Sequence, residues 1–167
     1  MGRTLLDLAT RVADDVDEKT TDATVMEKIK RFINRYYKDV AKRQKYSEVK
    51  VTAVDGLFVK PEYYKIGVQL RYKESPIDFS EDGSNISCEQ SGELTFVFEM
   101  DYEALLDLTD IQTPVTFVAN DEVILSGAKY NYWKSENKYN KAEIEKRDYE
   151  TAYIKRPIVK LVFKTYR

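Results

Sequence analysis

The sequence predicts an α+β fold in which helices at both ends of the chain flank an inserted antiparallel β-meander. Near each end, apolar residues recur at the spacing of an amphipathic helix. Between residues 47 and 118 they alternate with polar residues, which is typical of strands with one buried face. The 167 residues contain no internal repeat and no Pro- or Gly-rich linker, so we expect one domain, 1–167.

The region 1–46 predicts two helices. The first begins at Thr4, because Thr4 and Asp7 have the spacing of a capping pair ahead of an apolar stripe. A polar loop follows, and Thr24 with Glu27 predicts a second capping box at the start of a longer helix. Helices joined by so short a loop are expected to pack antiparallel.

The region 47–118 predicts four to six antiparallel strands. The clearest runs from Tyr64 to Tyr72, where aromatic and aliphatic residues occupy every second position. Asp-Gly pairs, which favour tight hairpin turns, occur at two places in this region. Cys88 continues the alternation, and we expect its side chain to face the core.

The region 120–156 predicts two more helices. Asn120, followed by two acidic residues, is a good N-cap for the first, and Asn140 begins the second. Pro157 ends that helix because proline disfavours helical geometry in the residue before it. The remaining residues, 157–167, form an arm in which apolar residues and lysines are interleaved. Such an arm can pair as a strand with its own chain or with another.

The net charge of −2 conceals large differences between segments. Residues 46–123 hold 16 acidic and 5 basic residues, whereas residues 24–45 hold 8 basic and 2 acidic residues. The last segment, 155–167, holds 5 basic residues and no acidic one. An acidic sheet and a basic arm favour head-to-tail binding between copies, a contact that closes into a ring when the rotation permits.

The chemistry available to the chain is narrow. It has no His and one Cys, which removes most zinc sites, serine and cysteine triads and imidazole acid–base catalysis. No glycine pattern fits a phosphate-binding loop. Neighbouring carboxylates leave a carboxylate-using enzyme as a distant alternative. We therefore expect no enzyme activity, no cofactor and no metal.

No stretch approaches the roughly 20 apolar residues that span a bilayer, so we expect a soluble protein with no membrane partner. The second predicted helix is strongly basic. Its cations at Lys38, Lys42 and Arg43 could form a face between subunits or follow a phosphate backbone. Against DNA binding, the first helix offers acids to neutralise them. A DNA-binding accessory protein remains an alternative.

Four segments resemble the head-to-tail connector (adaptor) proteins of tailed bacteriophages. Residues 5–16 and 29–43 are similar to the N-terminal helix pair of that family. Residues 121–133, where an aliphatic pair precedes Gly-Ala and an aromatic residue, and residues 149–153 are similar to its closing helices. The resemblance covers both helical ends, roughly half of the chain.

The resemblance implies a structural virion protein of the phage neck. The family assembles in the host cytoplasm as a ring, commonly dodecameric, on the portal protein. The ring extends the channel through which DNA passes without sequence-specific binding, and it gives the stopper or tail-completion protein a docking surface for genome ejection. A stopper or tail-terminator of the same neck is the main alternative. In relatives an extended C-terminal arm docks onto the portal. The resemblance assigns that role here to the apolar residues Ile158, Val159, Leu161, Val162 and Phe163, with Lys160 and Lys164 as flanking charges.

Overall fold

A computed structural model describes residues 2–44, 46–115, 121–154 and 161–163 and confirms the α+β class and the helix-strand-helix order. The chain divides into two compact units. The helical unit comprises the described residues of 1–43 and 106–154, and the β unit comprises those of 44–105 together with 161–163. The strands end at Met100, before the predicted limit of residue 118, and the segment that follows residue 105 belongs to the helical unit.

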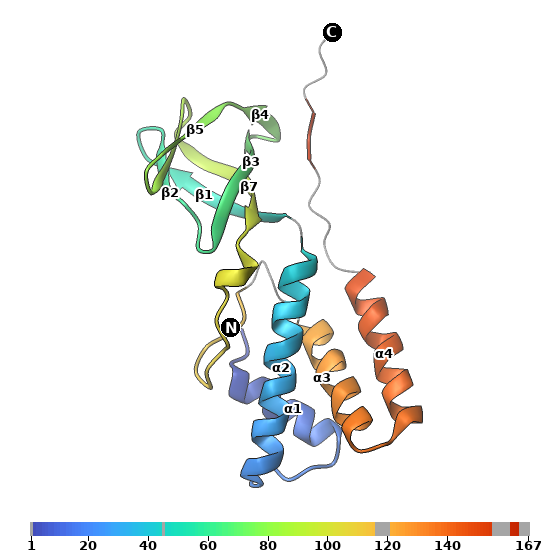
Figure 1. Ribbon diagram of the computed structural model, residues 1–167. Helices are drawn as coiled ribbons and strands as arrows, with labels where there is room; N and C mark the ends of the chain where they lie inside the picture. Colours follow the sequence, from blue (N-terminus) through green and yellow to red (C-terminus); the bar gives the residue numbers. More distant parts are fainter. Residues whose placement is uncertain (1, 45, 116–120, 155–160, 164–167) are drawn as a thin grey trace. The chain divides into compact units, whose positions relative to one another are not determined.

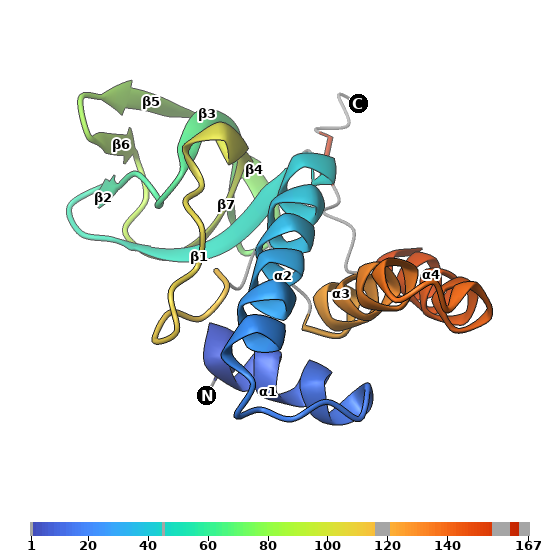
Figure 2. The ribbon, with the colours of Figure 1, turned by 60° about the horizontal axis from the view of Figure 1, so that its bottom comes forward.

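The helical unit contains α1 (Leu5–Asp15), α2 (Ala23–Arg43), α3 (Asp121–Ser135) and α4 (Tyr139–Ile154). In Figures 1 and 2, α3 and α4 lie side by side as a hairpin, and α1 lies obliquely across α2. Helix α2 also packs against α3. The core of the unit is mainly aliphatic, with fully buried side chains at Leu8, Ile29, Ile33, Ile124 and Leu125, and it also contains the fully buried ring of Tyr37.

The predicted cap of α1 is confirmed and that of α2 is wrong. Thr4 Oγ1 accepts the N–H of Asp7 at 3.2 Å, and Asp7 Oδ2 accepts the N–H of Thr4 at 2.9 Å. At α2, Thr24 lies inside the helix and does not pair with Glu27. Asp22 caps this helix instead, because its Oδ1 accepts the N–H groups of the second and third helical residues at 2.9 and 3.1 Å.

The last two helices differ slightly from their predicted ends. Asn120, the predicted cap of α3, lies outside the described residues. Helix α4 begins at Tyr139, one residue before Asn140, and its first turn is closed by the N–H of Ala142 donating to the carbonyl of Lys138 at 3.0 Å. Asn137 lies between α3 and α4 with a φ of 57°, a left-handed conformation that asparagine tolerates.

The β unit contains two antiparallel sheets. The first has the order β1 (Ser47–Ala53), β7 (Gly92–Met100), β3 (Tyr64–Tyr72) and β4 (Ser75–Ile77); the second has β2 (Leu57–Val59), β6 (Asn85–Cys88) and β5 (Phe79–Asp82). A 3₁₀ turn, Tyr102–Ala104, follows β7. The seven strands of the described residues exceed the predicted four to six, and the first and last are neighbours, so the insertion is more elaborate than one meander. Cys88, predicted to face the core, is only half-buried.

Aromatic side chains form the core of the β unit around Phe96. Its ring lies 5.3 Å from that of Phe58 and 5.6 Å from that of Phe79, both in edge-to-face contact. Gly67 makes this packing possible, since a Cβ there would lie 2.7 Å from the Phe79 ring. The sequence pattern of β3 did not show this role for a glycine.

The strand from Tyr64 to Tyr72 is confirmed as β3, but its strict alternation is wrong. The register against β7 shifts twice, between Tyr64 and Ile66 and between Gly67 and Gln69. Such bulges add a residue on one strand and change which face the next side chain occupies. Ile66, predicted on the buried face, is consequently 52% exposed.

Candidate functional site

The described part of the C-terminal arm forms one side of a groove on the β unit. This groove, which we call the Gln69 groove, has a volume of about 540 Å³ and lies beside β3 and β4. Its walls are Val68, Gln69, Leu70, Pro76, Ile77, Asp78 and Phe79, and the arm contributes Val162 and Phe163. Most of the wall residues are apolar by type, but the surface that faces the groove is more polar than apolar and includes one carboxylate.

The side chain of Gln69 binds the backbone of one arm residue through two hydrogen bonds. Gln69 Nε2 donates to the carbonyl of Val162, and the N–H of Val162 donates to Gln69 Oε1 at 3.1 Å. A carboxamide has one donor and one acceptor side, so it satisfies both polar groups of a residue much as a neighbouring strand would. The arm is thus recognised by its backbone.

The groove lies where the first sheet is open. Within the described residues, β4 pairs with β3 only from Leu70 to Tyr72. No described strand covers β3 from Tyr64 to Gln69 on the side away from β7. An open edge leaves backbone donors and acceptors available to another segment. The register shift just before Gln69 is the irregularity that can direct its side chain to this edge.

Three of the seven predicted arm residues are described. Leu161 and Val162 are half-buried, and Phe163 lines the groove while remaining 80% exposed. The other four lie outside the described residues: Ile158, Val159, Lys160 and Lys164. The central arm residues therefore lie beside a sheet edge of their own chain.

The three predicted basic residues of α2 do not form one free patch. Lys38 Nζ lies 2.6 Å from Asp107, and Arg43 Nε lies 3.1 Å from Asp39. Lys42 is exposed and has no ion-pair partner in the described part of the chain. The expectation that acids of the first helix would neutralise α2 is wrong for these residues.

Exposed cations without partners do occur on α2, at other positions. Arg31, Arg35 and Lys42 are exposed, and none of them forms an ion pair with a described residue. Their spacing of four and seven residues places them on one side of the helix. The sequence did not predict this stripe, because it does not show which basic side chains form ion pairs with acidic ones.

Two of the acids that pair with cations of α2 come from residues 106–115, which we call the strap; the others are Glu27 and Asp39 of α2 itself and Glu136. The side chain of Asn34 binds the strap backbone, since its Oδ1 accepts the N–H of Leu108 at 2.7 Å and its Nδ2 donates to the same residue's carbonyl at 3.2 Å. Lys30 forms an ion pair with Asp110 at 2.9 Å. The strap is thus fixed to α2 by the same carboxamide-to-backbone contact that holds the arm.

Two polar clusters tie the helices together. Lys129 of α3 lies 3.3 Å from Asp15 of α1 and 3.4 Å from Glu145 of α4. Burial raises the pKa of Glu145 above its usual value of 4.5, and the charge of Lys129 opposes that rise. These side chains connect three helices inside the unit.

The second cluster joins α2, α3 and α4 through tyrosines. The ring of Tyr36 meets that of Tyr149 edge to face at 5.1 Å, and the Tyr149 hydroxyl donates to Asp39 at 2.7 Å. Burial raises the pKa of Tyr36 to about 12 and also raises that of Tyr149. Gly127 of α3 faces this cluster, because a Cβ there would lie 2.3 Å from Cδ1 of Tyr36.

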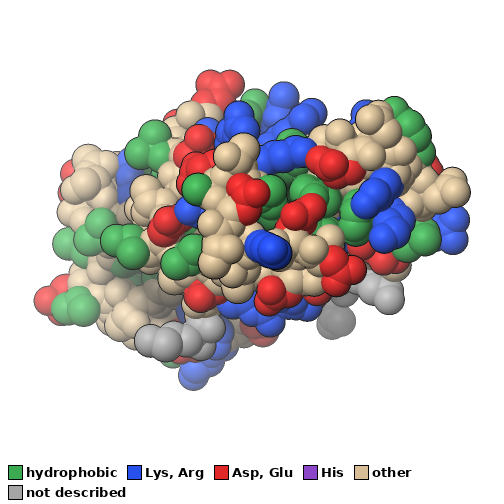
Figure 3. Space-filling view, turned by 90° about the horizontal axis from the view of Figure 1, so that it is seen from below, with side chains coloured by type: hydrophobic (Ala, Val, Ile, Leu, Met, Phe, Trp, Pro, Cys, Tyr) green, Lys and Arg blue, Asp and Glu red, His purple; other side chains and the backbone are tan. Residues whose placement is uncertain are grey.

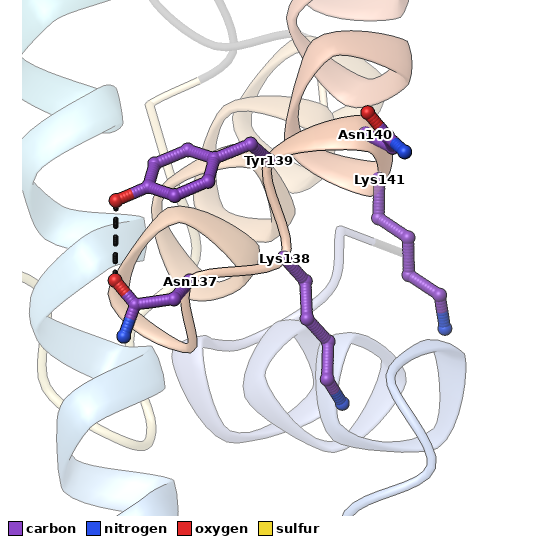
Figure 4. A pocket seen from close by; sticks show the side chains of 5 residues that line it. All are labelled: Asn137, Lys138, Tyr139, Asn140 and Lys141. Carbon is purple, nitrogen blue, oxygen red and sulfur yellow. Dashed lines mark hydrogen bonds between the residues drawn. The ribbon is translucent and has the colours of Figure 1, made fainter.

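A small pocket lies at the turn between α3 and α4 (Figure 4). Its volume is about 360 Å³, and the side chains that line it carry only amide, phenol and ammonium groups. Tyr139 donates to Asn137 Oδ1 at 3.1 Å. The ammonium groups of Lys138 and Lys141 lie 5.0 and 4.3 Å from the centre of the Trp133 ring, in cation–π contact. We assign no binding role to this pocket.

Figure 3 shows acidic and basic side chains interspersed on the face seen from below, with hydrophobic side chains between them. Among the described residues, no group of three or more His, Cys, Asp or Glu side chains could hold a metal ion. None of the described helices combines the length and the apolar character needed to cross a membrane.

No protein-family model matches the chain, and no curated protein matches it either.

Proposed function

We propose that this chain is a structural subunit of an adaptor ring between the portal protein and the stopper or tail of a tailed bacteriophage. The observation that carries the proposal is the arm segment Leu161–Phe163, which is bound beside an open sheet edge through its backbone. A segment recognised in this way can add to a sheet edge on a partner as well. The portal is the partner that the family resemblance suggests.

The organisation of the helical unit also supports the proposal. The segments that resemble connector proteins come from both ends of the chain, and they lie together in one compact unit. The opposite charges of the α2 stripe and the acidic β unit suit a head-to-tail contact between copies. In a dodecameric ring of the virion neck, DNA would pass through the lumen, and acidic surface would repel its phosphates.

The test is to mix the full-length chain with the portal ring of the same virus and to measure particle mass and shape by native mass spectrometry and negative-stain microscopy. We expect a ring of copies on the portal. A chain that remains monomeric beside the portal would overturn the proposal. A stopper or tail-terminator would add only to a portal that already carries another ring.

Deleting residues 157–167 should abolish portal attachment and leave the fold intact. Circular dichroism and the fluorescence of Trp133 would verify the fold. The matched control is a chain in which the order of residues 157–167 is shuffled, because it keeps the length and the charge of the arm. If attachment depended only on charge or on backbone recognition, the shuffled arm would work as well as the native one; a loss of attachment would show that the order of the arm's side chains also matters.

A DNA-binding accessory role is the second candidate. The exposed stripe of Arg31, Arg35 and Lys42 favours it, since three unpaired cations on one side of a helix can follow a phosphate backbone. Such binding would depend steeply on salt and not on base sequence.

A further inference from the structure

We infer that the Gln69 groove is a binding site for the Leu161–Phe163 segment of a second copy of this chain. In the setting of the proposed ring, this contact would link neighbouring subunits by exchange of arms. The groove and the arm are properties of the chain itself, so the contact can be tested without a portal.

The first step is the chemistry of recognition. Gln69 binds the N–H and the carbonyl of Val162 and makes no hydrogen bond to the side chains of the described arm residues, 161–163. The groove therefore requires a peptide residue whose two backbone groups are free. An arm that pairs with no strand meets this requirement, whichever copy it comes from.

The second step is the choice of occupant. The surface that faces the groove is more polar than apolar, although most wall residues are apolar by type, and Asp78 adds a negative charge. The segment Leu161–Phe163 is apolar and is flanked in the sequence by Lys160 and Lys164. The two cations match the carboxylate of Asp78, and the polar surface of the groove suits the backbone contact that Gln69 makes. The arm therefore fits this groove better than the acidic segments of the chain do.

The third step is topological. The arm follows α4 of the helical unit, whereas the groove belongs to the β unit. An arm from a second copy would make the same contacts as the chain's own arm, which is why exchange of an identical element is a low-cost route to assembly. Within a ring, where copies are held side by side, the neighbour's groove competes at high effective concentration.

The experiment uses two full-length variants in a Cys88→Ser background, so that each chain carries one thiol. The acceptor chain carries Ile77→Cys in the groove wall, and the donor chain carries Phe163→Cys at the exposed end of the arm segment. Both changes leave Gln69 and the backbone of Val162 in place. A short bismaleimide is then added to an equal mixture, in which the donor chain carries a small mass tag.

We expect a donor–acceptor product whose yield rises with protein concentration. Adding Gln69→Ala to the acceptor should reduce the yield roughly 30-fold, the factor expected for the loss of two hydrogen bonds of ordinary net strength. The same change in the donor should not reduce the yield, because the donor's own groove is not used. A chain carrying both thiols controls for reach, since it should crosslink within itself.

Crosslinking within the double-thiol chain, together with no donor–acceptor product at any concentration, would overturn the inference. Equal loss of yield from Gln69→Ala in either chain would overturn it as well. If the donor thiol reacts only with a portal subunit when portal rings are added, the arm belongs to the portal and not to a second copy. That result would leave the proposed ring intact, whereas a donor–acceptor product without any ring on the portal would refute only the proposed function.

Discussion

Replacing Gly127 with Ala tests how closely α3 packs on α2. A Cβ at this position would lie 2.3, 2.5 and 2.7 Å from Cδ1, Cγ and Cε1 of Tyr36. These atoms belong to the ring and include its root, so they cannot swing away as the tip of a flexible chain could. The ring is also in edge-to-face contact with Tyr149.

The expected magnitude is the balance of two effects. Alanine is better than glycine inside a helix by about 0.8–1 kcal/mol. Overpacking a well-packed site costs about 1–3 kcal/mol, and three contacts below 3.0 Å favour the upper part of that range. We therefore expect Gly127→Ala to lower the free energy of unfolding by about 1–2 kcal/mol.

The assay is urea unfolding followed by the fluorescence of Trp133, which lies in α3 and is the only tryptophan of the chain. The midpoint should fall while the dependence on urea stays the same. In a Tyr36→Ala background the obstruction is gone, so Gly127→Ala should become stabilising by about 0.5–1 kcal/mol. An equal cost in both backgrounds, or stabilisation of the native chain by Gly127→Ala, would refute the reasoning.

Three further predictions concern the contacts of the helical unit. Asn34→Ala should destabilise the chain by about 2–3 kcal/mol, because it leaves the N–H and the carbonyl of Leu108 in the strap without their partners. Hydrogen exchange of the strap amides should accelerate in this variant. Unchanged exchange would show that this contact does not hold the strap. Glu145 binds its proton more tightly in the folded chain, so its contribution to the free energy of unfolding should fall as the pH rises from 4.5 through its raised pKa. Glu145→Gln should remove that fall, which urea midpoints measured across this pH range would show. An equal dependence of the midpoint on pH in both chains would contradict the prediction. If the second candidate function holds, changing Arg31, Arg35 and Lys42 to Gln should reduce the slope of log affinity for duplex DNA against log salt by about 0.9 per residue, whereas an unchanged slope would exclude the stripe.

Local signals predicted the helices well. The pairing of Thr4 with Asp7 needs only residues that are close in sequence, and the structure contains it. The predicted cap of α2 was wrong because two good N-cap residues, Asp22 and Thr24, lie two positions apart. Only the three-dimensional structure of the helix shows which of them is the cap. Helix existence was thus predictable, whereas exact ends were not.

Long-range contacts could not be predicted in the same way. The pairing of β1 with β7 joins residues about 45 positions apart, and alternation in the sequence carries no information on such partners. Gln69 looks like an ordinary polar position of a strand until the register shift before it is known. Likewise, the sequence near Lys38 does not predict that Asp107 is its ion-pair partner. The groove and the strap depend on these distant pairings.

The division of the chain affects how it can fold during synthesis. Apart from the arm segment, the β unit is made from one continuous stretch, 44–105, whereas the helical unit needs segments from both ends. At about 5–20 residues per second, the 78 positions from Arg43 to Asp121 take roughly 4–16 s to translate. During that interval α1 and α2 have been made, but their apolar faces lack α3 and α4. The β unit can complete its sheets in this time, so the nascent chain holds a finished β unit tethered to an unfinished helical unit, which a chaperone or the ribosome surface would have to shield.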